Sequence, residues 1–204
     1  ASTMTVTNTG APVANAGADA SICTSEGGIT LAGTASNYST ILWTTSGDGT
    51  FSDSSLLTTT YTPDITDIST GFVTLTLNVF GNGSCDSISD AMVLTIYIAP
   101  TAYAGDSTEI CEGDVVVLSG ATAENYTALH WATSGTGTFD NDTILNPTYT
   151  PSADDILSGY VELTLIATGA GNCPAFASTM TVTITGAPVA SAGADASMCT
   201  SEGT

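Results

Sequence analysis

The five cysteines are the side chains of this sequence whose spacing most clearly suggests chemistry. They occupy positions 23, 85, 111, 173 and 199, and the gaps between them are 62, 26, 62 and 26 residues. Such gaps do not fit the closely spaced cysteines of metal sites, so we interpret the thiols as disulfide partners. The spacing predicts the bonds Cys23–Cys85 and Cys111–Cys173, with the partner of Cys199 beyond residue 204. Disulfides indicate an oxidising compartment, and a set of buried thiols is the alternative.

The sequence offers little for catalysis. His130 is the only histidine, so neither a catalytic triad nor a histidine-based metal site can be assembled. Serine and threonine are abundant, but no base stands ready to activate them. We therefore predict no catalytic residue and no enzymatic activity.

Aspartates are the remaining candidates, because calcium prefers oxygen ligands from carboxylates and carbonyls. No recognised calcium-loop spacing occurs, so we favour turn aspartates that accept hydrogen bonds from nearby backbone amides. This interpretation predicts no metal and no other cofactor, with calcium as the alternative. The aspartates considered are Asp19, Asp48, Asp53, Asp106, Asp140, Asp142, Asp154, Asp155 and Asp195.

The charge composition excludes two classes of partner. The chain has no lysine or arginine and 20 acidic residues. Nucleic-acid binding and attachment to anionic membranes both require cationic side chains, so neither is expected. No apolar run is long enough to span a bilayer, and we predict no membrane insertion. Trypsin-like proteases also find no cleavage site in such a chain.

The cysteine rhythm is part of an 88-residue repeat. The sequence also repeats with a longer period of 176 residues, because residues 1–28 match residues 177–204 at 24 of 28 positions. The repeating unit is therefore a pair of different domains, within a polypeptide that we expect to be much longer. We predict the last strand of a preceding domain at 1–10, domain A at 11–98, domain B at 99–186, and the first strand of a following domain A at 187–204. Positions that keep the 88-residue offset include Trp43 and Trp131, Tyr61 and Tyr149, Pro63 and Pro151, and Gly71 and Gly159.

Each repeat has the pattern of an all-β domain. From Phe72 to Phe80, apolar residues alternate with polar ones, as expected for a strand with one buried face. Turn-forming residues separate several such segments. About seven strands with one tryptophan and one disulfide per domain predict tandem immunoglobulin-like β-sandwiches. We further expect Cys23 in a short strand parallel to the final strand, which would bring the sulfur atoms of Cys23 and Cys85 to the same end.

Several motifs resemble the PKD (polycystic kidney disease) domain. They are residues 12–19 (PVANAGAD), 29–33 (ITLAG), 43–50 (WTTSGDGT) and 73–77 (VTLTL). The second repeat departs from the pattern at Gly135-Thr136-Gly137, where the family has Gly-Asp-Gly. The segments LWTTSGxGTF and TYTPxxxDI more closely resemble PKD-like repeats of very large secreted Bacteroidota surface proteins, including gliding-motility adhesins. The resemblance implies a β-sandwich with a spacer or adhesive role at the cell surface, without catalysis.

Three triplets that begin with Asp-Ser or Asp-Thr resemble the Asp-Ser/Thr-hydrophobic pattern that is O-glycosylated in secreted Bacteroidota proteins. Their acceptor residues are Ser87, Ser107 and Thr143. Short patterns of this kind also arise by chance in a chain rich in serine and threonine.

Together these features predict a structural segment of an extracellular, cell-surface filament or adhesin stalk. It would act as a semi-rigid, protease-resistant spacer whose partners are adjacent repeats of the same chain or like filaments. Proline fixes φ at the short junctions near Pro100 and Pro188, which favours a rigid connection. The alternative is that the repeats themselves bind polysaccharide or neighbouring filaments as an adhesive module.

Overall fold

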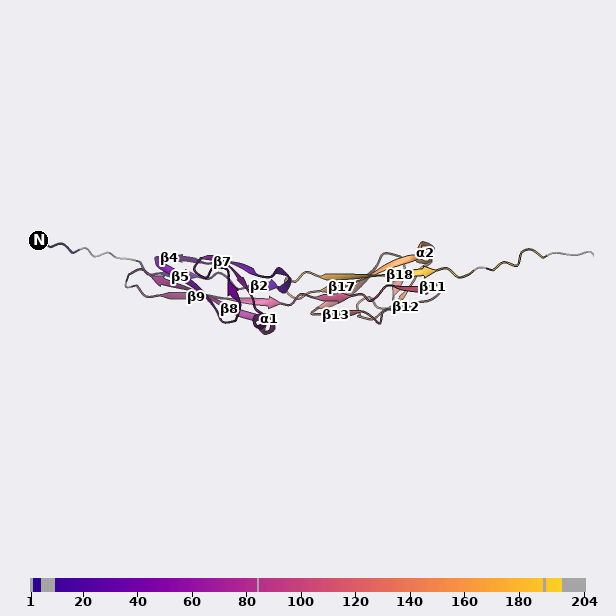
Figure 1. Cartoon of the computed structure of the whole chain (residues 1–204), viewed down its shortest axis with the longest axis horizontal. Coiled ribbons are helices and arrows are strands. Elements are labelled where there is room, and N and C mark those ends of the chain that lie inside the picture. Colours follow the sequence, from indigo (N-terminus) through magenta and orange to yellow (C-terminus); the bar gives the residue numbers. More distant parts are fainter. Residues whose placement is uncertain (1, 5–9, 84, 189, 196–204) are drawn as a thin grey trace, which may run out of the picture.

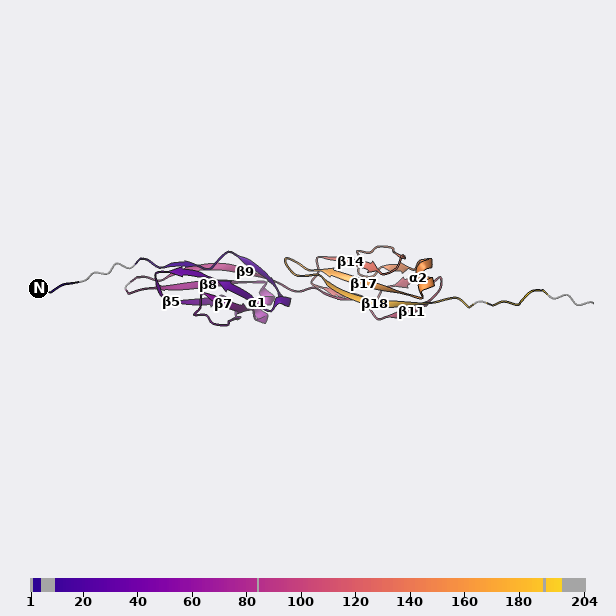
Figure 2. The same ribbon diagram turned by 90° about the horizontal axis from the view of Figure 1, so that it is seen from above.

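The fold consists of two β-sandwiches arranged end to end along the long axis of the molecule (Figures 1 and 2). The computed structural model describes residues 2–4, 10–83, 85–188 and 190–195. We call the sandwich formed by β1–β9 domain A and the one formed by β10–β18 domain B. The predicted all-β architecture of tandem sandwich domains is confirmed.

Domain A consists of nine strands, one short α-helix and a 3-10 turn. Its elements are β1 (Val13–Asn15), β2 (Ala20–Cys23), η1 (Thr24–Glu26), β3 (Ile29–Ala32), β4 (Thr34–Ser36), β5 (Tyr38–Thr45), β6 (Thr50–Phe51), β7 (Thr58–Thr62), α1 (Ile65–Thr70), β8 (Phe72–Gly81) and β9 (Ile88–Tyr97).

Domain B repeats this order of strands and α-helix. Its elements are β10 (Thr101–Tyr103), β11 (Thr108–Cys111), β12 (Val116–Val117), β13 (Thr122–Glu124), β14 (Ala128–Thr133), β15 (Thr138–Phe139), β16 (Thr148–Thr150), α2 (Ala153–Ser158), β17 (Tyr160–Thr168) and β18 (Phe176–Thr185).

Corresponding sheets form in both domains. In domain A, the four-stranded sheet has the order β2-β9-β8-β5, a three-stranded sheet has the order β3-β7-β6, and β1 pairs with β4. The sheets of domain B are β11-β18-β17-β14, β12-β16-β15 and β10-β13. All pairs are antiparallel except β2 with β9 and β11 with β18. The expected parallel pairing of the Cys23 strand with the last strand is thus confirmed.

The apolar side chains that alternate with polar ones in the sequence face a core between the sheets. In β8, Val73, Leu75, Leu77 and Val79 are buried, as Val161, Leu163 and Leu165 are in β17. Trp43 and Tyr61 pack with the β8 residues in one cluster, and their counterparts do so in domain B. Each domain therefore has its own core, which the period-2 pattern correctly predicted.

Two local features differ from expectation. Each domain has nine strands rather than about seven, because two- and three-residue strands pair along the edges of the sandwich. Each also contains one six-residue helix, too short to show helical periodicity in the sequence. These helices begin at capping residues Asp64 and Ser152 and end at Gly71 and Gly159, whose φ values are 82° and 77°. Within the described part of the chain, no helix has the length and apolarity needed to cross a membrane.

The predicted flanking strands fall largely outside the described residues. Residues 1 and 5–9 in the first segment, and 189 and 196–204 in the last, are not described, and Cys199 is among them. The proposed boundaries of domains A and B at 11–98 and 99–186 stay predictions.

Candidate functional site at the domain junction

A disulfide joins the two domains. It links Cys23, at the end of β2 in domain A, to Cys173, in the turn before β18 in domain B. The Cα atoms are 4.9 Å apart, within the usual range for a disulfide of about 4.4–6.8 Å. The bond spans 150 residues of sequence, whereas the predicted bonds would each span 62.

The predicted pairs Cys23–Cys85 and Cys111–Cys173, one per domain, are therefore wrong. The reason lies in the parallel pairing that the sequence analysis anticipated. The register places Cys23 opposite Tyr97, at the carboxyl end of β9, whereas Cys85 precedes the amino end of β9 at Ile88. At about 3.3 Å per residue, these ends lie about 30 Å apart. Parallel pairing thus sends the two sulfur atoms of one domain to opposite ends of the sandwich.

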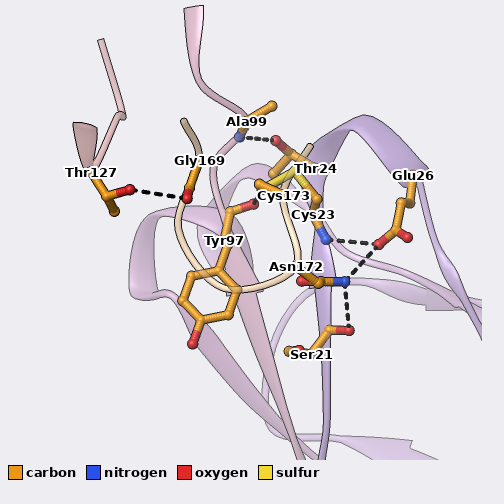
Figure 3. Close-up of a disulfide and its surroundings, with 10 residues drawn as sticks. All are labelled: Ser21, Cys23, Thr24, Glu26, Tyr97, Ala99, Thr127, Gly169, Asn172 and Cys173. Carbon is orange, nitrogen blue, oxygen red and sulfur yellow. Dashed lines mark hydrogen bonds between the residues drawn. A yellow bond between two sulfur atoms is a disulfide. The ribbon is translucent and has the colours of Figure 1, made fainter. Parts of the chain in front are cut away.

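Polar contacts surround the disulfide and cross between the domains (Figure 3). The side-chain amide of Asn172 in domain B donates to the Ser21 carbonyl oxygen at 3.3 Å and to Glu26 Oε2 at 3.4 Å. Glu26 Oε2 also accepts a hydrogen bond of 2.8 Å from the backbone N–H of Cys23. One carboxylate therefore connects the turn of domain B to the strand that carries the disulfide.

The turn of domain B also packs closely against Tyr97. Gly171 has a φ of 57°, and a Cβ atom built there would lie 2.1 Å from Cε2 of Tyr97. Glycine is therefore required for both the backbone conformation and the close approach. Nothing in the sequence singled out Gly171 or Asn172 as residues of the junction.

The peptide connection between the domains is short and anchored. Only residues 98–100 separate β9 from β10. The backbone N–H of Ala99 donates to Thr24 Oγ1 at 2.9 Å. The disulfide lies beside this linker, because Cys173 Sγ is 3.5 Å from the carbonyl oxygen of Tyr97. Two covalent connections, the linker and the disulfide, thus hold the junction, and hinge bending would have to break or strain one of them.

The other two described cysteines lie at the outer ends of the molecule. Cys111 is exposed at the end of β11, in register with Thr185 of β18, and its thiol is not part of a disulfide. Cys85 is half-buried in the turn between β8 and β9, and its Sγ lies 4.0 Å from the Gly10 carbonyl oxygen. Both positions match, by the 88-residue repeat, those of the bonded cysteines at the junction.

Inside each domain, a buried aspartate organises the turn that follows the tryptophan strand. Asp67 is 2 % exposed and accepts hydrogen bonds from the hydroxyl of Tyr61 at 2.6 Å and from the backbone N–H groups of Asp48, Gly49 and Asp64 at 3.0–3.2 Å. Burial alone would raise the pKa of Asp67, but these donors outweigh it and hold the pKa below its usual range. Burial, followed by the neighbouring carboxylate, raises the pKa of Tyr61 to about 12.

Domain B contains the same arrangement. Asp155 accepts from the Tyr149 hydroxyl at 2.7 Å and from the backbone N–H groups of Thr136, Gly137 and Ser152 at 2.9–3.0 Å. Its pKa is also lowered, because these hydrogen bonds outweigh the raising effect of burial. Burial, with a further contribution from Asp155, raises the pKa of Tyr149 to about 12, although the Thr133 hydroxyl acts in the opposite direction.

These aspartates explain why the Gly-x-Gly turn tolerates Asp48 in one repeat and Thr136 in the other. The central residue contributes its backbone N–H, which any residue other than proline supplies. The flanking glycines have no such freedom, because a Cβ at Gly47 or Gly135 would lie within 2 Å of the carboxylate. The recurring TYTPxxxDI segment carried the signal for Asp67 and Asp155. Asp155 is one of the aspartates that the sequence predicts to accept hydrogen bonds from backbone amides, and it does so here, whereas nothing in the sequence singled out Asp67.

The aspartates considered for calcium are dispersed. Among the residues that the structure describes, no three acidic, histidine or cysteine side chains form a group able to hold a metal ion. Several accept hydrogen bonds from the backbone: Asp19 from Val93, Asp53 from Ser55, and Asp140 from Asn141 and Thr148.

The remaining candidates are bound by other side chains or exposed. Asp154 accepts from Thr136 Oγ1, Asp106 accepts from the Tyr103 hydroxyl, and Asp48 and Asp195 are exposed. His130 Nδ1 lies 3.4 Å from Asp142, with both side chains about half exposed.

The three predicted glycosylation residues are exposed and lie apart from the junction disulfide. Ser87 precedes β9, Ser107 precedes β11, and Thr143 follows β15. Ser107 Oγ accepts from the backbone N–H of Thr181, and Thr143 Oγ1 donates to Asn141 Oδ1 at 2.7 Å.

Comparison with known proteins identifies the fold. No protein-family model matches the chain, and no curated protein matches its sequence. The chain is similar to the structure of Sidekick-1 immunoglobulin domains 1–4, with a TM-score of 0.51 and 14% identity over 86% of this chain and 49% of that one. It is also similar to extracellular domains 3–5 of Drosophila OTK, with a TM-score of 0.50 and 11% identity over 82% and 59% of the two chains. The chain thus spans about half the length of the first of these, and the likeness shows tandem immunoglobulin-like sandwiches.

Proposed function

We propose that this protein is a non-catalytic, semi-rigid spacer within an extracellular surface protein built from successive sandwich domains. The main support is the doubly connected junction, in which the Cys23–Cys173 disulfide lies beside a linker of three residues. A flexible string of domains would have no use for such a second connection. The end-to-end arrangement extends the molecule along one axis, which suits a stalk (Figure 1).

Other features support the extracellular assignment. Disulfides persist in oxidising compartments, and the absence of lysine and arginine removes the cleavage sites of trypsin-like proteases. The OTK structure comprises extracellular domains with a similar fold. Domains of this fold usually act in binding or as structural supports rather than in catalysis. The PKD-like motifs favour a bacterial surface filament or adhesin stalk, with adjacent repeats or like filaments as partners.

Small-angle X-ray scattering of the oxidised chain tests this function. We expect a narrow distribution of long dimensions for the native protein and a broader, shorter one for the Cys23→Ser/Cys173→Ser double variant. Cys111→Ser is the matched control, since it removes a thiol away from the junction disulfide and should leave the scattering unchanged. Scattering from freely jointed domains in the oxidised native protein would contradict the proposal.

A glycan array separates the spacer from its adhesive alternative. The spacer predicts no binding, whereas specific polysaccharide binding by the folded chain would favour the adhesive role. Glycans attached to the chain are a separate matter. We propose the exposed Ser87, Ser107 and Thr143 as O-glycan acceptors, and an intact mass from the native host equal to that of the bare sequence would contradict this.

A further inference from the structure

We infer that the outer end of domain B is a docking surface for a following domain of the A type, and that Cys111 forms a disulfide there with the cysteine of that domain that corresponds to Cys85. The inference rests on the proposed function, because only an array of successive domains supplies such a neighbour. It assigns one disulfide to every junction rather than one to the interior of every domain.

The receiving surface around Cys111 already has the geometry of the occupied surface around Cys23. Cys111 pairs in register with Thr185 as Cys23 does with Tyr97. Its backbone N–H donates to Asp114 Oδ2 at 3.3 Å, where that of Cys23 donates to Glu26 at 2.8 Å.

The chain leaving domain B is held in the same way. The backbone N–H of Ala187 donates to Glu112 Oε2 at 3.1 Å, as Ala99 donates to Thr24 at 2.9 Å. The exit of the chain and the thiol beside it are thus in place before any neighbour is present.

A shallow depression marks the place where the neighbour's turn would lie. It has a volume of about 570 Å³ and is lined by Glu109, Ile110, Cys111, Asp114, Val115 and Thr185. In domain A, the counterparts of Glu109, Cys111, Asp114 and Thr185 are Ser21, Cys23, Glu26 and Tyr97, the residues that contact the turn of domain B. The surface around Cys111 therefore corresponds, position by position, to the surface of domain A that contacts domain B.

The incoming turn has the matching shape in domain A. The backbone N–H of Cys85 donates to the Asn82 carbonyl oxygen at 3.1 Å, as that of Cys173 donates to Ala170 at 3.0 Å. A Cβ at Gly81 would lie 2.6 Å from Cys85 Cβ, and one at Gly169 would lie 2.5 Å from Cys173 Cβ. The turns that carry the two cysteines are therefore built alike.

The sequence identifies the occupant. Residues 177–204 repeat residues 1–28 at 24 of 28 positions, so the segment that follows domain B is the beginning of another A-type domain. That neighbour has serine and glycine where the turn of domain B has Asn172 and Gly171, since Ser84 and Gly83 occupy these positions. Thr185 likewise replaces the larger Tyr97.

Bond formation requires an oxidant, and a small-molecule disulfide such as oxidised glutathione supplies it. One protein thiolate attacks the small disulfide and releases one reduced thiol. The second protein thiolate then attacks the mixed disulfide, which forms the protein S–S bond and releases the other reduced thiol. The two protein thiols lose two protons and two electrons in total, and the small disulfide becomes two thiols.

The test extends the full chain, with its own Cys85 replaced (Cys85→Ser), by an unchanged copy of residues 29–98 placed after Thr204, which completes a third domain; the replacement is needed because the two Cys85 peptides are otherwise identical. The chain is refolded in a glutathione buffer, alkylated, and digested without reduction by a protease that cleaves at acidic residues. Mass spectrometry should identify two cross-linked peptide pairs, Cys23 with Cys173 and Cys111 with the appended copy of Cys85. The first pair shows in the same digest that oxidation is complete.

Three variants sharpen the result. Cys111→Ser should abolish only the second cross-link, and Cys199→Ser should retain both. A Cys23→Ser/Cys173→Ser variant should still form the second, because each junction closes independently. Cys111 joined to Cys173, or Cys111 alkylated in a digest that contains the Cys23–Cys173 pair, would overturn the inference.

The outcome separates this inference from the proposed function. A stiff array in which Cys111 stays alkylated would refute the second disulfide and leave the spacer role intact. A cross-linked array that binds a polysaccharide specifically would refute the pure spacer role and leave the disulfide intact.

Discussion

The sequence repeat gives nearly identical structures inside the two domains but different structures at the domain ends. The interiors are near copies: Asp67 and Asp155 accept the tyrosine hydroxyl at 2.6 and 2.7 Å, with the same set of backbone donors around them. At the domain ends, equivalent residues differ in state, since Cys23 is disulfide-bonded and Cys111 is exposed. A repeat therefore reproduces whatever a domain completes by itself, whereas a junction depends on which neighbour is present.

The largest effect is expected from removing the buried carboxylates. Asp67→Ala should destabilise domain A by about 3–5 kcal/mol, because the Tyr61 hydroxyl and several backbone N–H groups lose their acceptor in a buried site. Asp155→Ala should do the same to domain B. Differential scanning calorimetry should resolve the loss as a shift of one transition in each variant.

The exposed Asp48 is the matched control for this comparison. Asp48→Ala keeps the backbone N–H that donates to Asp67, so its effect should stay within about 0.5 kcal/mol. If Asp67→Ala were as mild as this control, the buried aspartate would not organise the domain interior.

High pH should weaken both interiors together. Tyr61 and Tyr149 have a pKa of about 12 in the folded protein, against 10.0 for the unshifted side chain. Their contribution to the free energy of unfolding is therefore complete below pH 10 and is lost as the pH rises through 12. A pKa difference of two corresponds to a loss of about 2–3 kcal/mol in the free energy of unfolding of each domain. Urea unfolding at increasing pH measures the loss, and Tyr61→Phe should remove the tyrosine-dependent part from domain A alone. An unchanged alkaline profile in that variant would assign the loss to other groups.

A smaller effect is expected at the junction from two matched glycine substitutions. Gly171 and Gly83 have φ values of 57° and 63°, so alanine at either position is strained to a similar degree. A Cβ meets the Tyr97 ring only at Gly171, since none of the described atoms lies within 4 Å of the one built at Gly83. Gly171→Ala should therefore lower the equilibrium constant for the Cys23–Cys173 bond in glutathione buffers about tenfold, or about 1.4 kcal/mol.

Gly83→Ala should leave that equilibrium constant unchanged, because the substitution lies at the far end of domain A. Equal effects of the two alanines would mean that the contact with Tyr97 does not stabilise the junction.

The sequence was a reliable guide to the features that repeat locally. Alternation in Phe72–Phe80 predicted which residues of β8 face the core, and the spacing of strands and turns predicted a sandwich. The short helices and the shortest strands were not predicted, because a segment of six residues or fewer shows no clear periodicity in the sequence. Asp67 was within a recurring segment, but its role became visible only when folding brought Tyr61 and the Gly-x-Gly turn around it.

The disulfide partner lay beyond what a periodic sequence determines by itself. A cysteine 62 residues ahead and another one full repeat further on occupy the same position within a domain, so spacing cannot distinguish a bond inside a domain from a bond between domains. The tertiary structure decided the pairing through the direction of one strand. Because β2 runs parallel to β9, Cys23 lies at the end of domain A that faces domain B, and among the described cysteines Cys173 is the one within reach.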